Sequence, residues 1–577
     1  MASNEEVTIR YWVDDKQKRV VMAEAGGDFV DILFSFLTLP LGIIIRLEFE
    51  GKFRQNQPHQ PVDIGCIKNL YKSVKDLKSD VFWNDICQKM LLFPRNPLEA
   101  SCQRLKLKVD DTPPTKYFMC HSCSRGSDLL LSTFEGAMCD CGESMKNVEL
   151  LVESKEESGG DKGVFVERDA MFLIYDDLTV LRSSPSNSVS PPLQFGHKDF
   201  SRMTEVSVNV GLDKMPGHFP YSNTLIMIFS ILKQALTSKY PLSDAFLPDR
   251  ESKLSYSFSP DNGPSHSEGS VEIKVMVNKS KNEIQFIEAD EDFVDYLVSF
   301  LTTPLGSILN LMNGKLSLGS IDKLYKSVKN IDPSWFIGSS NKSLLNPRVA
   351  PQFGCKSNPL NSLQEEDTPK YWYGTVVTKD NKECKMISKR EDKVQGPTEM
   401  KLFDPRCSVG ARESGVGFMK RPCLFVVTDD LKVIPMATNS SIEYLQELKN
   451  VRPSDLEEHF VEIRKSHEAL NLLRASLTSD KAVFTKSLSY LLNKWRCQRC
   501  IPFCGALLRR KEMRDKKKKE KEGKKVREVR SNRMEKKEKE KKKVKKQRNK
   551  KKMEKKGDEN KQMLTTTPEE AKEEIKV

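Results

Sequence analysis

Four cysteines in the first third of the chain have a spacing that suits metal binding. Cys120 and Cys123 form a C-x2-C pair, and Cys139 and Cys141 form a C-x-C pair followed by Gly142. Zinc favours four soft ligands in a tetrahedron, supplied by two tight turns that a short hairpin brings together. The run SDLLLSTFEG between the pairs suits that hairpin, and glycine at 142 suits a turn with positive φ. The spacing predicts a structural zinc site at Cys120, Cys123, Cys139 and Cys141.

The second pair is one residue shorter than the C-x2-C turn of an ordinary zinc ribbon. This leaves three alternatives: a distorted site, a site in which His121 replaces one ligand, or no site, with the cysteines as buried reduced thiols or a redox pair. Fourteen cysteines in a chain of 577 residues without a secretory signal favour reduced thiols over a disulfide framework. A catalytic metal is disfavoured, because the sequence has no H-E-x-x-H motif and its seven histidines are scattered.

Two pairs of acidic residues, Asp176-Asp177 and Asp429-Asp430, each lie between two apolar runs. A catalytic carboxylate pair is one interpretation, but a β-turn between two strands is favoured, because aspartate is common in such turns. The sequence contains no G-x-S-x-G motif and no glycine-rich phosphate loop in a strand–helix setting. We therefore predict no catalytic residue, no bound organic cofactor and no enzymatic activity.

The elements that would position the cysteines occur twice. DFVDILFSFLTLPLG (28–42) is repeated as DFVDYLVSFLTTPLG (292–306), 264 positions later. Each copy follows two alternating apolar runs joined by a polar turn, which predicts a β-hairpin. Asp28 and Asp292 are expected to be helix N-caps. Phenylalanine and leucine at i, i+4, i+7 and i+8 form an apolar stripe, and the proline near the end of each motif should end or kink the helix.

Further matches follow in the same order along both copies, including FLIYDDLTV (172–180) with FVVTDDLKV (425–433). Gly374 and Val377 stand where the first copy has its C-x2-C pair, so the second copy should hold its core without metal. The expected fold class is α+β: two tandem divergent copies of one domain, each with β-hairpin, helix, second hairpin and terminal helix. The expected boundaries are a first copy at 5–248 with the cysteine insert at 116–146, a linker at 249–269, a second copy at 270–495 and a Lys-rich tail at 509–577.

The ordered motifs carry a family resemblance. An opening VTIRYW strand, the DFVD…FLT-PLG segment, LYKSV, a DTP-KY stretch before a cysteine pair and a terminal LKQALTS helix occur together. This set resembles the uncharacterised plant family known as domain of unknown function six-seven-four, over roughly 5–250 and 270–490. The resemblance implies a plant protein without an assigned role. It supplies no catalytic residue and no substrate.

The charge of the chain is concentrated in its tail. From 509 to 577 there are 31 basic and 15 acidic residues, a net charge of +16, whereas residues 1–508 carry −3. Such a segment cannot bury a core, so we expect it to be disordered or a solvated helix or coiled coil. Its lysine runs suit nuclear import or polyanion contact, including nucleic acid. We expect a binding or scaffold protein with an unidentified protein partner, no transmembrane segment, and a cytoplasmic or nuclear location; the oligomeric state is left open.

Overall fold

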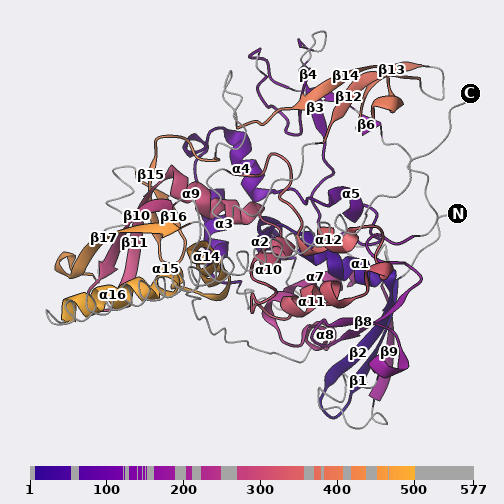
Figure 1. Ribbon diagram of the computed structural model, residues 1–577, viewed down its shortest axis with the longest axis horizontal. Coiled ribbons are helices and arrows are strands. Elements are labelled where there is room, and N and C mark those ends of the chain that lie inside the picture. The colour runs from indigo at the N-terminus through magenta and orange to yellow at the C-terminus, as the bar shows by residue number, and fades with distance from the viewer. Residues whose placement is uncertain are drawn as a thin grey trace, which may run out of the picture. The chain divides into compact units, whose positions relative to one another are not determined.

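The computed structural model shows an α+β protein, and the residues that it describes form three β-sheets (Figure 1). The chain divides into two units, residues 1–492 and residues 493–577, and the sheets belong to the first. The described residues are 7–52, 64–120, 122–123, 129–139, 141–145, 147–149, 151–152, 162–188, 203–210, 223–247, 270–355, 369–377, 382–406, 417–436, 451–464 and 467–500. The expected linker at 249–269, the tail at 509–577 and His121 lie outside these ranges.

The first sheet belongs to the first half of the chain. Its five strands are all antiparallel and have the order β8-β7-β2-β1-β9. Their bounds are β1 Val7–Asp14, β2 Arg19–Gly26, β7 Met171–Tyr175, β8 Val180–Arg182 and β9 Met203–Val210. Burial alternates along the start of β1, as expected for a strand with one face on a core. The predicted hairpin is therefore present, and its register shifts between Trp12 and Val13.

The second sheet repeats this arrangement in the second half. Its order is β16-β15-β11-β10-β17, again antiparallel throughout. The bounds are β10 Ser270–Asn278, β11 Glu283–Asp290, β15 Leu424–Thr428, β16 Val433–Pro435 and β17 Leu456–Arg464. The hairpin register shifts between Met276 and Val277, the positions that match Trp12 and Val13 in the sequence repeat. The two sheets therefore share a strand order and an irregularity at matching positions of the sequence repeat.

The repeated DFVD segments form α1 (Gly27–Ser35) and α9 (Glu291–Val298), each continued by a short 3-10 turn, η1 (Phe36–Thr38) and η4 (Ser299–Thr302). The apolar stripe of each is fully buried, and each helical run stops before the proline, as predicted. The prolines are then the N-caps of the next helices, α2 (Leu41–Phe49) and α10 (Leu305–Leu311).

The prediction that Asp28 and Asp292 are N-caps is wrong. Gly26 is the N-cap of α1 without a side-chain bond, and Asp290 is the N-cap of α9, where its carboxylate accepts from the Phe293 N–H. Asp28 instead pairs with Lys106 at 2.7 Å and Arg168 at 3.1 Å, and Asp292 pairs with Arg421. Both carboxylates are therefore used by cations from distant loops rather than by their own helix.

Helices of each half pack on the sheet of the other half. In the first half, α3 (Ile67–Asp76) packs on β16, and the Val433 N–H donates to Ser73 Oγ at 3.0 Å. In the second half, α11 (Ile321–Asn330) packs on β8, and the Val180 N–H donates to Ser327 Oγ at 2.8 Å. The exchange is reciprocal, and residues of both halves consequently lie in one compact unit.

The third sheet is built from both halves. Its order is β5-β3-β4-β14-β12-β13-β6, and β3, β4 and β6 lie beside β12, β13 and β14 in Figure 1. The bounds are β3 Tyr117–Met119, β4 Leu129–Ser132, β5 Asn147–Glu149, β6 Leu151–Val152, β12 Tyr371–Val377, β13 Glu383–Ser388 and β14 Gln395–Leu402. One apolar cluster joins the two halves inside it, made of Tyr117, Met119, Leu129, Leu131, Tyr371, Tyr373, Ile387 and Met400, with Leu402 packed against it.

Further helices lie along the described part of the chain. They are α4 (Asp85–Leu92), α5 (Glu99–Cys102), α7 (Asn223–Thr237), α8 (Pro241–Phe246), α12 (Ser340–Leu345), α14 (His467–Thr478), α15 (Val483–Ser487) and α16 (Ser489–Cys500). The predicted terminal helices of the two copies correspond to α7 and α14. Within the described ranges, no helix is both long and apolar enough to cross a membrane.

Candidate metal centre

The first cysteine pair lies where β3 ends. Tyr117 and Met119 point into the apolar cluster of the third sheet, and this anchors the strand up to its last residue. Cys120 follows directly and is buried, with 2 % of its surface exposed. Cys123 lies in the turn beyond it and is half-buried. The packing of β3 therefore fixes the first thiol of the pair.

The second cysteine pair lies in a small hairpin. The Met145 N–H donates to the Ala137 carbonyl at 2.7 Å, and the Cys139 N–H donates to the Glu143 carbonyl at 2.8 Å. The chain reverses between these bonds, where the Gly142 N–H donates to the Cys139 carbonyl at 2.9 Å. Gly142 has φ +85°, so its predicted positive φ is confirmed. The hairpin makes the short C-x-C turn sufficient to bring both thiols to one side.

The four sulfur atoms form one compact group. All four Sγ atoms lie within 4.8 Å of one another. Cys120 Sγ is 3.5 Å from Cys141 Sγ, and Cys123 Sγ is 3.6 Å from Cys139 Sγ. Ligands at about 2.3 Å from a tetrahedral zinc ion are about 3.8 Å apart, whereas bonded sulfurs are about 2.05 Å apart. The spacing therefore fits four thiolates around one metal ion and does not fit two disulfides.

Hydrogen bonds and burial shift the pKa values of these thiols in different directions. The Glu143 N–H hydrogen-bonds to Cys141 and lowers the pKa of this exposed thiol. A hydrogen bond with Cys141 raises the pKa of the Cys123 thiol, and burial raises the pKa of the Cys139 thiol. A metal ion binds thiolates, so its binding would displace the thiol protons and depend on pH.

The second half has continuous strand at the positions of the first cysteine pair. Gly374 and Val377 lie within β12, which pairs with β13 from Trp372↔Ser388 to Val377↔Glu383. A Cβ on Gly374 would lie 2.7 Å from the Gln395 carbonyl oxygen, so the close approach of β14 requires glycine here. The second half thus uses backbone hydrogen bonds where the first half has the cysteine cluster.

The two acidic pairs are turns, as predicted, and the first aspartate of each also holds a helix. Asp176 accepts hydrogen bonds from the Ser243 N–H at 2.8 Å and the Ser243 hydroxyl at 2.7 Å, at the start of α8. Asp429 accepts from the Phe484 N–H at 2.6 Å and the Thr485 N–H at 3.0 Å, at the start of α15. These carboxylates are committed to helix N-termini.

Sequence reasoning missed two buried carboxylates, Asp31 and Asp295. Asp31 accepts backbone hydrogen bonds from three consecutive residues, 164 to 166, at 2.6 to 2.9 Å. Asp295 accepts from the N–H groups of Phe418 and Met419 at 2.8 and 3.0 Å. Burial raises the pKa of Asp31 to about 6 and that of Asp295 to about 7. Their repetition at the last position of DFVD was the available signal.

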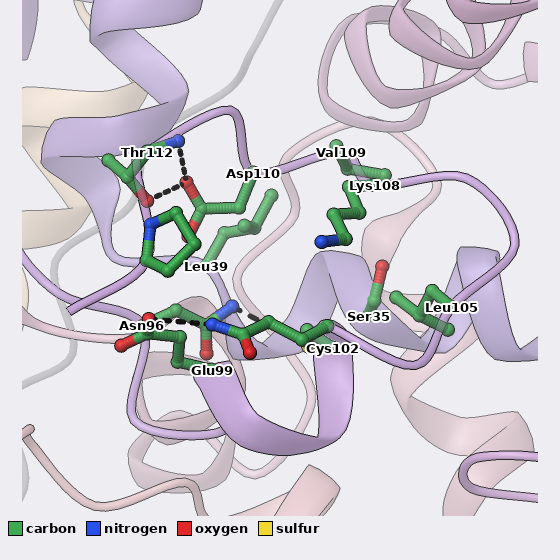
Figure 2. Close-up of a pocket in the computed structure, with 12 residues that line it drawn as sticks. Ser35, Leu39, Asn96, Glu99, Cys102, Leu105, Lys108, Val109, Asp110 and Thr112 are labelled. Carbon is green, nitrogen blue, oxygen red and sulfur yellow. Dashed lines mark hydrogen bonds between the residues drawn. The ribbon is translucent and has the colours of Figure 1, made fainter. Parts of the chain in front are cut away.

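A small, partly open pocket lies beside α5 (Figure 2). Its polar groups pair with one another. Asp110 accepts from the N–H and hydroxyl of Thr112, and Glu99 accepts from Gln103 Nε2 at 2.9 Å. Burial raises the pKa of Cys102 to about 12, so this thiol stays protonated at neutral pH. These contacts give the side chains of Glu99, Gln103, Asp110 and Thr112 structural roles.

Comparison with known proteins gives a single finding. The model of a family described as "Protein of unknown function (DUF674)" matches residues 3–466. No curated protein and no solved structure matches the chain. The match spans the strands of all three sheets and the four clustered cysteines.

Proposed function

We propose that this chain, which belongs to the DUF674 family, is a non-enzymatic binding or scaffold protein with a structural zinc site. The family is described only as a protein of unknown function, so membership assigns no activity. The observation that carries this proposal is the group of four Sγ atoms within 4.8 Å of one another. Four ligands from the chain complete a tetrahedron, which leaves no position open for a substrate. Such a site stabilises a fold rather than catalysing a reaction.

The choice of zinc follows from the ligand set. Four thiolates are soft ligands, which select zinc or an iron–sulfur cluster and disfavour magnesium or calcium. A single ion requires sulfur atoms about 3.8 Å apart, and two contacts in the group are 3.5 and 3.6 Å. A cubane cluster would hold its four cysteine sulfurs farther apart, since iron and inorganic sulfide stand between them. The observed spacing of the sulfur atoms matches a single ion and therefore favours zinc over an iron–sulfur cluster.

The non-enzymatic part of the proposal is supported by the buried carboxylates. Asp31, Asp176 and Asp295 are buried and Asp429 is partly buried, and each accepts hydrogen bonds from the backbone of another segment. A general base must instead be within hydrogen-bond reach of a substrate. These side chains join segments of the fold together.

Metal analysis of the purified full chain tests the zinc site. We expect about one zinc ion per chain, since four ligands make one site, and loss of this zinc in Cys139→Ser and Cys141→Ser. Cys423→Ser is the matched control, because Cys423 is a half-buried cysteine outside the cluster. Equal zinc contents in all four proteins would remove the site from the proposal.

The binding role is tested by affinity purification of the full chain beside a variant lacking residues 509–577. We expect the two halves to retain protein partners without the tail, in the cytoplasm or the nucleus. The alternative is a nucleic-acid-associated protein, which the net charge of +16 between 509 and 577 favours. Binding to RNA or DNA that weakens steeply with salt and disappears with the tail would establish that alternative instead.

A further inference from the structure

The strands of the third sheet form a closed ring. β5 pairs with β3 at one end of the strand order, and β6 pairs with β13 at the other end. Only Leu150 separates β5 from β6 in the sequence. Residues 147–152 therefore link both ends of the order. The ring consists of a run of first-half strands next to a run of second-half strands, which meet at β4–β14 and at β6–β13. We refer to residues 147–152 as the closing segment.

The closing segment follows directly after the cysteine cluster. Cys141 is the last ligand, and the hairpin that contains it ends at Met145, which is fully buried. Asn147 then pairs with Met119, the residue before Cys120. A metal ion bound by Cys120 and Cys141 would join the end of β3 to the start of the closing segment.

We infer that the metal centre locks the first half of the chain to the second by holding the closing segment in the ring. This inference rests on the proposed zinc site. The closing segment has three residue pairs with β3, Tyr117↔Glu149, Phe118↔Val148 and Met119↔Asn147. It has two pairs with β13, Ile387↔Leu151 and Ser388↔Val152. Strands this short are marginal without further support, and the metal supplies it.

Strand β12 of the second half shows how many residue pairs hold a strand of the ring in place without a metal site. β12 pairs with β13 over six residues, from Trp372↔Ser388 to Val377↔Glu383, and has no cysteine cluster beside it. It also pairs with β14 on its other side. The longer ladder supplies the stability that the shorter strands of the first half lack. Loss of the metal should therefore release the closing segment and expose the β13 edge that faces it, while β12 stays paired.

Hydrogen exchange of the full chain tests this lock, with and without an excess of zinc chelator. We expect the amides at the end of β13 that pairs with β6, Ile387 and Ser388, to exchange about tenfold faster or more after chelation, while those of β10 (Ser270–Asn278) keep their protection. Cys141→Ser should reproduce the effect without chelator. Cys423→Ser should not, since Cys423 lies outside the cluster.

Three results would overturn the inference. If the chain binds zinc and chelation removes it while exchange at 387–388 stays the same, the metal does not hold the ring, although the zinc site stands. If exchange accelerates equally at 270–278 and at 387–388, the metal stabilises the whole unit rather than this closure. If the purified chain binds no zinc at all, the proposed metal site fails together with the lock.

Discussion

The carboxylate of Asp295 makes stability depend on pH in a direction opposite to that of an ordinary surface acid. The side chain is fully buried, and its Oδ1 accepts the N–H groups of Phe418 and Met419. Its Oδ2 has no hydrogen-bond partner, and the nearest cation, Arg421 Nη2, is 3.9 Å away. Burial consequently raises the pKa of Asp295 from 3.8 to about 7. The folded chain holds a proton here that the unfolded chain releases.

The magnitude follows from this pKa. Between pH 4 and pH 7 the folded state binds one more proton at Asp295 than the unfolded state does. The free energy of unfolding therefore falls as pH rises, by about 1.4 kcal/mol per pH unit from this group. Asp295→Asn resembles the protonated acid, because its Oδ1 can accept the same two N–H groups. Between pH 5 and pH 7 the variant should gain about 2 kcal/mol relative to the native chain.

Urea unfolding of both proteins at pH 5, 6 and 7 measures this difference. Asp31 and Asp429, whose pKa values burial also raises to about 6, titrate in both proteins and cancel in the comparison. Asp392→Asn is the control, because its exposed carboxylate pairs with Arg390 Nη2 at 2.7 Å, which lowers its pKa. A constant stability difference between Asp295→Asn and the native chain across this pH range would refute the reasoning.

Two further substitutions test how the segments are joined. Gly163→Ala places a Cβ 2.1 Å from the Val166 carbonyl oxygen and should destabilise the chain by about 2 to 3 kcal/mol; Gly26→Ala, whose Cβ meets nothing closer than 3.7 Å, is the neutral control in thermal unfolding. Ser327→Ala leaves the buried Val180 N–H without its acceptor and should cost about 1 to 3 kcal/mol in urea unfolding, and an unchanged midpoint would show that this contact between the halves is dispensable.

Local sequence patterns were sufficient to predict several helices and hairpins and the grouping of the four cysteines. Alternating apolar residues predicted the two hairpins, and the spacing of phenylalanine and leucine predicted α1 and α9. The turn at Asp176-Asp177 and the positive φ of Gly142 were also predictable, because both depend on a few neighbouring residues. The grouping of the four cysteines was predictable for the same reason, because two close pairs separated by a short hairpin come together locally.

The remaining features depend on residues far apart in the chain. The N-caps were mispredicted at Asp28 and Asp292, because cations from other segments bind these carboxylates. Nothing in the DFVD motif shows that its last aspartate binds a loop more than a hundred residues away.

Periodicity and spacing are local properties, so the repeated motifs and the confinement of the close cysteine pairs to the first copy can be read from the residues alone. The packing of α3 and α11 on the opposite sheets, and the ring of strands shared by both halves, appear only in the folded chain. Long-range packing selects strand partners and the partners of buried carboxylates. The same alternating pattern is compatible with pairing inside one copy or across two.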